Sequence, residues 1–204
     1  PDVGTLGRQV VRFMDTPEFL SGLDIRDSRS VMFANYWFGL PRQGLVPTRR
    51  DFDPCTQGPI LSTYVIHELI SPDFIRVHLA GTGVREQYGT EITGTNYLDF
   101  VEGWRKENAS RSLFVICEQP CGILAHLRAR TATGKEVINE SIGLPMRDNS
   151  GAVRLIYYQS NTVFEEGYRD PEEDMLMTLE IEDETHFDIG AGLPDFQRLT
   201  GPPG

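Results

Sequence analysis

Hydrophobic and polar side chains alternate along several stretches of the chain, and each stretch predicts a β-strand. In the clearest one, Ile75, Val77 and Leu79 alternate with polar or small residues, which is the period of two expected for a strand with one buried face. Segments rich in glycine, proline, asparagine or aspartate separate most of these stretches. The five predicted strands are 60–70, 74–80, 122–130, 137–146 and 153–164.

The second predicted strand runs into a glycine-rich turn. Gly81 and Gly83 flank Thr82, and glycine adopts backbone angles that other residues resist. A short helix is predicted at 84–88, and Gly89 is placed to end it in the left-handed conformation. The pattern therefore predicts a strand that turns abruptly into one helical turn at the edge of a sheet.

Residues 28–39 form a predicted amphipathic helix. Phe33 and Trp37 are four residues apart with Tyr36 beside them, so one face of the helix is strongly apolar. A serine at its start can cap it, and Pro41 ends it because the residue before a proline avoids the helical conformation. Such a face must dock on something. It covers either the helix's own domain or a second copy of the chain.

A longer helix is predicted at 102–118, where Trp104, Leu113 and Cys117 lie on an apolar stripe. The order of elements is two strands, short helical pieces, this longer helix and then three strands. Successive strands without crossover helices pair in antiparallel fashion. The sequence therefore predicts an α+β domain with a single antiparallel five-stranded sheet, one face of which is covered by helices.

Composition divides the chain into four parts. These are a leader at 1–27, the N-terminal helix and a linker at 28–47, the folded domain at 48–164, and an extension at 165–204. The extension carries ten carboxylates and one arginine over 165–184 and ends rich in glycine and proline. Such a segment is expected to leave the core and stay solvated. Alternatively, the apolar residues Met175, Leu176 and Met177 belong to an element that docks on a partner.

The net charge of −11 narrows the range of partners. A strongly negative chain repels phosphate backbones, which argues against nucleic acid. No run approaches the roughly 18 apolar residues needed to cross a bilayer, so no membrane insertion is expected. The three cysteines, Cys55, Cys117 and Cys121, form no Cys-x-x-Cys pair, which is typical of reduced thiols in a cytoplasmic protein.

Enzyme classes find little support in the residues. The turn Gly81-Thr82-Gly83 is similar to part of a dinucleotide-binding fingerprint, but the third glycine of that fingerprint is replaced by Glu86. A hydrolase needs an activated nucleophile, yet there is no Gly-x-Ser-x-Gly motif and Cys117 lies on an apolar stripe. His67 and His78 are nearly opposite across the first hairpin, but no third ligand completes a metal site. Both histidines are therefore expected to face solvent.

Several short motifs occur in a fixed order along the chain. They are Tyr36-Trp37, Pro47-x-Arg49-x-Asp51-x-x-Pro54, Arg76-x-x-Leu79-Ala80-Gly81-Thr82, Tyr88-Gly89-x-Glu91-x-x-Gly94 and Leu144-Pro145-Met146-Arg147-Asp148. With the order of the predicted elements, this set resembles a PAS domain, and more specifically the short bacterial proteins in which one PAS domain of the family five type makes up most of the chain. The resemblance covers residues 35–159. It departs from the family pattern after Trp37, where the usual Leu-Arg is Leu40-Pro41-Arg42.

This resemblance implies a bacterial, cytoplasmic sensory or regulatory module without catalytic activity. It would signal through small-molecule binding, through contacts with a signalling protein, or through both. The residues to which it assigns a structural role are Arg49, Asp51, Pro54, Gly81, Thr82 and Gly89. PAS domains commonly dimerise through a helix before the first strand. A homodimer that uses Phe33, Tyr36 and Trp37 is therefore expected.

Within the resemblance, no cofactor is expected. Flavin-binding members carry an Asn-Cys-Arg-Phe run and haem-binding members a histidine on the long helix, and the chain has neither. The sheet residue His126 is a poor substitute, because it lies on the polar side of its strand. A pocket for an unidentified small molecule is expected to be lined by Tyr97, Phe100, Trp104, Leu113, Cys117, Ala125 and Leu127. If these side chains close-pack instead, the protein would be a constitutive scaffold that binds partners without a ligand.

Overall fold

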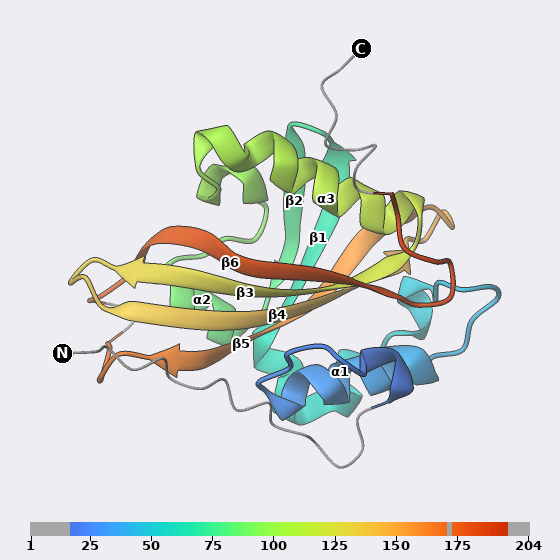
Figure 1. Ribbon diagram of the computed structural model, residues 1–204, viewed down its shortest axis with the longest axis horizontal. Helices are drawn as coiled ribbons and strands as arrows, with labels where there is room; N and C mark the ends of the chain where they lie inside the picture. The colour runs from blue at the N-terminus through green and yellow to red at the C-terminus, as the bar shows by residue number, and fades with distance from the viewer. Residues whose placement is uncertain (1–16, 171–172, 196–204) are drawn as a thin grey trace.

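The computed structural model describes residues 17–170 and 173–195 of the chain. One antiparallel sheet runs through it, with helices packed on both sides (Figure 1). Its strands are β1 Tyr64–Ser71, β2 Phe74–Ala80, β3 Cys121–Thr131, β4 Glu136–Arg147, β5 Val153–Glu165 and β6 Leu176–Asp188. The helices are α1 Ser28–Gly39, α2 Thr82–Tyr88 and α3 Lys106–Glu118, with short 3₁₀ helices at η1 Glu18–Leu20, η2 Arg49–Asp51, η3 Pro54–Thr63, η4 Tyr97–Phe100 and η5 Gly103–Arg105. The strand order is β2-β1-β5-β4-β3-β6.

The sheet has six strands rather than the predicted five, because β6 forms within the acidic extension. β6 pairs with β3 along its whole length, so the prediction that this segment leaves the core is wrong. The charges that suggested a solvated segment are partly neutralised by the neighbouring strand. Arg128 on β3 lies 3.3 Å from Glu182 and 2.6 Å from Glu136. The tip of the extension, 196–204, and the leader residues 1–16 lie outside the described residues.

The first strand begins later than predicted. The sequence pattern placed it at 60–70, whereas η3 occupies Pro54–Thr63 and β1 starts at Tyr64. Pro54 and Pro59 have no N–H to donate to a strand ladder, and Pro54 starts the helical turn instead. The side chain of Asp53 caps this helix by accepting a hydrogen bond from the Cys55 N–H at 3.0 Å.

Helices cover both faces of the sheet, although only one covered face was predicted. α2, η4 and α3 pack on one face, and α1 packs on the other (Figure 1). α1 starts after Asp27, whose carboxylate accepts from the Arg29 N–H at 2.8 Å. Asp27, rather than a serine, is thus the N-cap. A core therefore lies on each side of the sheet.

The apolar face of α1 is used inside its own chain. Phe33 and Trp37 are both 0% exposed, and the Trp37 indole N–H donates to the Pro145 carbonyl at 3.0 Å. Tyr36 is partly exposed, and its hydroxyl accepts from the Asp53 N–H at 2.8 Å. Phe33 and Trp37 therefore cannot be the dimer surface proposed for them, because α1 has buried them against the sheet. A homodimer through other residues stays a prediction.

The glycine turn after β2 has an architectural role. A Cβ at Gly81 would lie 2.2 Å from the Ser62 carbonyl oxygen, which is too close for any side chain. α2 begins at Thr82, and Gly89 ends it in the left-handed conformation with φ of 67°. The predicted strand, turn and cap are all confirmed here, and the close approach of Gly81 to η3 explains why a glycine is required.

The motif residues of the 47–54 segment hold a loop against the β1–β2 hairpin. Arg49 Nη1 lies 2.8 Å from His78 Nε2 on β2. Asp51 accepts a hydrogen bond from the Thr48 hydroxyl at 2.5 Å, and Pro54 opens η3. The structural role that the resemblance assigns to Arg49, Asp51 and Pro54 stays a prediction.

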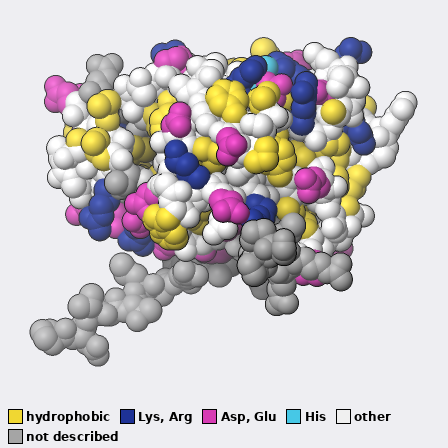
Figure 2. Space-filling model, turned by 90° about the horizontal axis from the view of Figure 1, so that it is seen from above, with side chains coloured by type: hydrophobic (Ala, Val, Ile, Leu, Met, Phe, Trp, Pro, Cys, Tyr) yellow, Lys and Arg dark blue, Asp and Glu magenta, His cyan; other side chains and the backbone are white. Residues whose placement is uncertain are grey.

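Charged side chains of both signs are interspersed on the α3 side of the molecule (Figure 2). Among the coloured side chains in that view, no continuous basic patch appears. Within residues 17–170 and 173–195, no helix has the length and apolar character that a membrane crossing requires.

Candidate functional site

A cavity of about 80 Å³ lies between the sheet and the helices α2, η4 and α3. Every strand of the sheet contributes to its wall. The aliphatic side chains that line it include Leu113, Ile123, Ala125, Leu127, Leu179 and Ile181. Its aromatic side chains are Tyr88, Tyr97, Phe100 and Tyr158. Its polar side chains are His67, Ser141, Ser160 and Glu184.

Five of the seven predicted pocket residues line this cavity. They are Tyr97, Phe100, Leu113, Ala125 and Leu127. Trp104 does not, because it lies in η5 before α3 and its side chain points outward: the residue is 74% exposed and its indole donates to Glu102 at 2.9 Å. Cys117 packs against the core beside the cavity, and burial raises the pKa of its thiol. Whether the five lining residues bind a ligand stays a prediction.

His67 is buried in the cavity wall, although it was predicted to face solvent. It is 7% exposed and packs between the rings of Tyr97 and Tyr158, with centroid distances of 4.6 Å and 5.0 Å. A bulge in the β1–β2 ladder pairs His67 with Val77, so His78 points to the other face, 3.3 Å from Glu68. Burial lowers the pKa of His67 to about 3, so the imidazole is neutral at pH 7.

The polar groups of the wall are only partly satisfied by the protein. His67 Nδ1 is buried and has no hydrogen-bond partner within the described part of the chain. The Ser141 hydroxyl donates to Ser160 at 2.9 Å. Burial raises the pKa of Tyr88 to about 12 and raises the pKa values of Tyr97 and Tyr158 further. The cavity therefore offers neutral donors and acceptors in an apolar surrounding.

Sequence reasoning missed the cavity residues that come from β5 and β6. Tyr158 and Ser160 lie two residues apart on β5, and this alternation was visible in the sequence. Ile181 and Glu184 come from β6, which was not recognised as a strand. The alternation of Leu179 and Ile181 with glutamates was the signal that could have found it.

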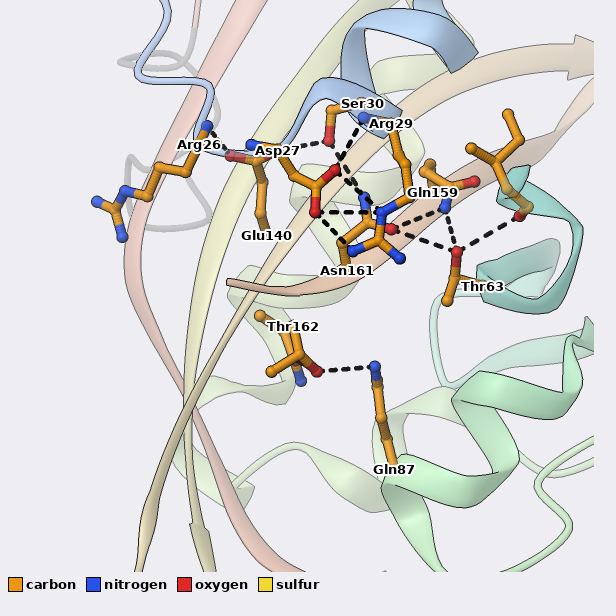
Figure 3. A network of polar contacts seen from close by, with 12 residues as sticks. Arg26, Asp27, Arg29, Ser30, Thr63, Gln87, Glu140, Gln159, Asn161 and Thr162 are labelled. Carbon is orange, nitrogen blue, oxygen red and sulfur yellow. Dashed lines mark hydrogen bonds and ion pairs between the residues drawn. The ribbon is translucent and has the colours of Figure 1, made fainter. Parts of the chain in front are cut away.

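A second polar cluster lies on the opposite face of the sheet, under α1 (Figure 3). Its centre is Glu140 on β4, which is 0% exposed. The Glu140 carboxylate accepts from the backbone N–H groups of Arg26 and Asp27, at 2.5 Å and 3.2 Å, and from the Ser30 hydroxyl at 2.5 Å. It therefore fastens the start of α1 to the middle of the sheet.

The buried amides of β5 extend this cluster toward β1. Asn161 donates to the Ser30 hydroxyl at 3.4 Å and accepts from Gln159 at 2.9 Å. Gln159 also donates to the Thr63 hydroxyl. Gln159 and Asn161 are both 0% exposed, so the network links α1, β5 and η3 through the interior. Buried polar networks of this kind favour one specific packing of the elements they join.

His126 on β3 connects the same cluster to β6. Its Nε2 lies 3.3 Å from Glu140 and its Nδ1 lies 2.7 Å from Asp183. Both partners are carboxylates, so the ring donates from both nitrogens only when it is protonated. Burial alone lowers the pKa of His126, but the hydrogen bonds to Glu140 and Asp183 outweigh burial and leave the pKa above 6.5. When it is protonated, the buried imidazole therefore bridges β4 and β6.

The free energy of unfolding should fall as the pH rises above neutrality, through the loss of this proton. Because the folded-state pKa of His126 lies above its unfolded value of 6.5, the stabilisation is complete below pH 6.5 and is lost as the pH rises through the folded pKa. Urea unfolding at pH 6.5 and pH 8.5 measures the change. His126→Gln should lose it, whereas the matched His78→Gln variant on β2 should keep it. An equal response in both variants would contradict the assignment.

The model of the PAS domain family matches residues 25–157 of the chain. The match covers more than half of the sequence and spans α1, α2, α3 and the strands from β1 into β5. The chain belongs to the PAS domain family. PAS domains are general sensory and regulatory modules.

Other comparisons add little to the family assignment. No match was found among curated proteins. One solved structure that matches is described as an RNA-binding light-oxygen-voltage receptor. It is 17% identical, the match covers 70% of this chain and 45% of that chain, and the TM-score is 0.40.

The described residues of this PAS domain contain no group of three or more His, Cys, Asp or Glu side chains placed to hold a metal ion. β6 lies beyond the matched residues, although it pairs with β3 and contributes Leu179, Ile181 and Glu184 to the cavity. The sixth strand is thus an addition to the matched region that takes part in the site.

Proposed function

We propose that this protein is a non-enzymatic PAS sensor that binds a small molecule in the cavity between the sheet and the helices α2, η4 and α3. The observation that carries the proposal is the unpartnered Nδ1 of His67, buried in a cavity wall that is otherwise mostly apolar. An unsatisfied buried polar atom costs roughly 1–3 kcal/mol. A ligand with one polar group would remove that cost, which is how pockets of this type gain specificity.

The size of the cavity limits the ligand. An engineered apolar cavity of about 150 Å³ binds benzene, whereas this cavity holds about 80 Å³. Scaled to the six non-hydrogen atoms of benzene, this cavity holds a ligand of about three non-hydrogen atoms. A bound flavin or haem would require a large rearrangement of the wall, so the proposed sensor uses neither.

Binding would be read out as a shift between two packings of helix against sheet. Residues of α3 and β6 both line the cavity. Asp183 on β6 contacts His126, and His126 contacts Glu140, which accepts from the Asp27 N–H at the start of α1. A ligand that changes the position of β6 would thereby change the surface around α1. We propose that a signalling protein in the bacterial cytoplasm reads this surface. The three unpaired cysteines, Cys55, Cys117 and Cys121, support a reducing compartment.

Small-probe titration of the full chain tests the proposal. Isotope-labelled protein titrated with ethanol, a probe of three non-hydrogen atoms, should show NMR shifts that cluster at His67, Tyr97 and Ala125. Ala125→Met should fill the cavity and abolish the shifts, whereas Ala132→Met, at an exposed turn position, should preserve them. Circular dichroism checks that both variants fold. Binding that survives in Ala125→Met, or no shifts in the unaltered protein, would favour the constitutive scaffold instead.

A further inference from the structure

Within the described part of the chain, the cavity wall contains an acidic side chain but no lysine or arginine. Four aromatic rings and the neutral imidazole of His67 line it, together with a single carboxylate, that of Glu184. Among the described residues that line the cavity, none is lysine or arginine. An anionic ligand would therefore have no cation to meet, while a cation would meet both a carboxylate and the negative faces of aromatic rings.

Glu184 is held at the cavity by β6 and α3. It pairs with Ala125 across the β3–β6 ladder, and both side chains line the cavity. The Ser112 hydroxyl on α3 donates to its carboxylate at 2.7 Å. The side chain is 25% exposed. Burial raises the pKa of Glu184, and the hydrogen bond from Ser112 offsets only part of this effect.

The carboxylate of Glu184 lacks a cationic partner among the described residues. Its one ion-pair neighbour there is His186, with Nδ1 at 3.7 Å. Burial lowers the pKa of His186 to about 4, so this imidazole is neutral at pH 7. With its side chain 25% exposed, the carboxylate is only partly desolvated, and the lack of a counter-ion leaves its charge unbalanced. A cationic ligand would supply the missing charge.

Glu184, Ser112 and His186 do not form a hydrolytic triad. Ser112 Oγ lies 3.3 Å from His186 Nε2, which is within reach of a general base. The serine has one hydroxyl proton, however, and it is directed to Glu184 at 2.7 Å. The imidazole thus does not activate the serine, and the three residues are better explained as support for a charged anchor.

We infer that the ligand of the cavity is a small organic cation, an alkylammonium of about three non-hydrogen atoms, with Glu184 as its counter-ion. The inference rests on the proposed function, since it names the ligand class of the same cavity. Tyr97 and Tyr158, whose rings contact His67 in the cavity wall, would supply aromatic surface to the cation. Aromatic rings beside one carboxylate are the usual means of recognising ammonium groups.

Three probes of similar size and different charge test this inference on the full chain: ethylammonium, ethanol and formate. Calorimetric titration should show ethylammonium binding about tenfold more tightly than ethanol and no binding of formate. Glu184→Gln should remove the tenfold preference and leave ethanol binding within about twofold of its original value. Glu180→Gln, an exposed position on the same strand that does not line the cavity, should change neither.

The outcomes separate the inference from the proposed function. If ethanol binds in the cavity as tightly as ethylammonium, the cation inference is overturned and the sensor proposal stands. If none of the probes binds, both fail. An equal loss of preference in Glu184→Gln and Glu180→Gln would also overturn the inference, because general surface charge would then be the cause. Circular dichroism of both variants excludes misfolding as the reason for lost binding.

Discussion

Replacing Glu140 with alanine is expected to lower the free energy of unfolding by about 3–5 kcal/mol, which is the usual cost of removing one partner of a buried ion pair. The carboxylate is 0% exposed and accepts from two backbone N–H groups, one hydroxyl and His126. Without the Glu140 carboxylate, the N–H groups of Arg26 and Asp27 and the Ser30 hydroxyl lose this acceptor, and the imidazole of His126 keeps only one of its two carboxylate partners. The start of α1 would lose its anchor to the sheet.

Urea unfolding of three variants, Glu140→Ala, Glu140→Gln and Glu180→Ala, measures this effect relative to the unaltered protein. Glu180→Ala is the control, because Glu180 is an exposed carboxylate on β6, and its loss should cost no more than about 1 kcal/mol. Glu140→Gln keeps the size of the side chain and one oxygen acceptor, so it should fall between the other two variants. If Glu140→Ala were as stable as Glu180→Ala, the cluster under α1 would not hold the fold together.

Trp37→Ala is the second large effect, with an expected loss of about 3–5 kcal/mol. The side chain is 0% exposed, and the Arg42 guanidinium lies 4.8 Å from its ring centroid. Truncation would leave a cavity under α1 and an unpaired carbonyl at Pro145. Trp37→Phe should cost less, because it keeps an aromatic ring and loses only the hydrogen bond and part of the volume.

Two measurements on Trp37→Ala distinguish the packing of α1 on its own chain from a role in dimerisation. Chemical unfolding should show the loss of stability, and the mass in solution, measured by light scattering, should equal that of the unaltered protein. A reduced mass with unchanged stability would contradict the burial of Trp37 within one chain.

Local patterns in the sequence were enough to place most of the elements. The alternation of Ile75, Val77 and Leu79 predicted β2, and the glycines that follow predicted the turn into α2 and its cap. The apolar stripe of 102–118 correctly placed α3, and it brought Leu113 to the cavity. These elements could be predicted because their pattern depends on which face of each element is buried.

The errors arose where a distant contact overrides the local pattern. His67 was expected nearly opposite His78, but a bulge in the β1–β2 ladder places it opposite Val77, and a shift of one residue moves a side chain to the other face. Trp104 precedes α3, so its place on the apolar stripe did not apply. β6 was hidden by its carboxylates, because Arg128 and His126, which partly neutralise them, are more than fifty residues away.

The buried cluster could not be found from the sequence at all. Glu140 and Ser30 are 110 residues apart, and neither lies in a motif that signals the other. A glutamate in a strand normally indicates an exposed face. Only the position of α1 on the second face of the sheet turns Glu140 into an interior anchor.

The acidic charge of β6 has a further consequence for how copies of the protein behave at high concentration. The outer edge of β2 is partly bonded by its own chain, since Val77 exchanges hydrogen bonds with Thr95 and Gly94. β6 is the last strand at the other edge, and Glu180 and Glu182 are exposed along it. Like charges on an open edge oppose strand addition from another copy. The acidity that disguised this strand in the sequence thus protects the sheet from edge-to-edge aggregation.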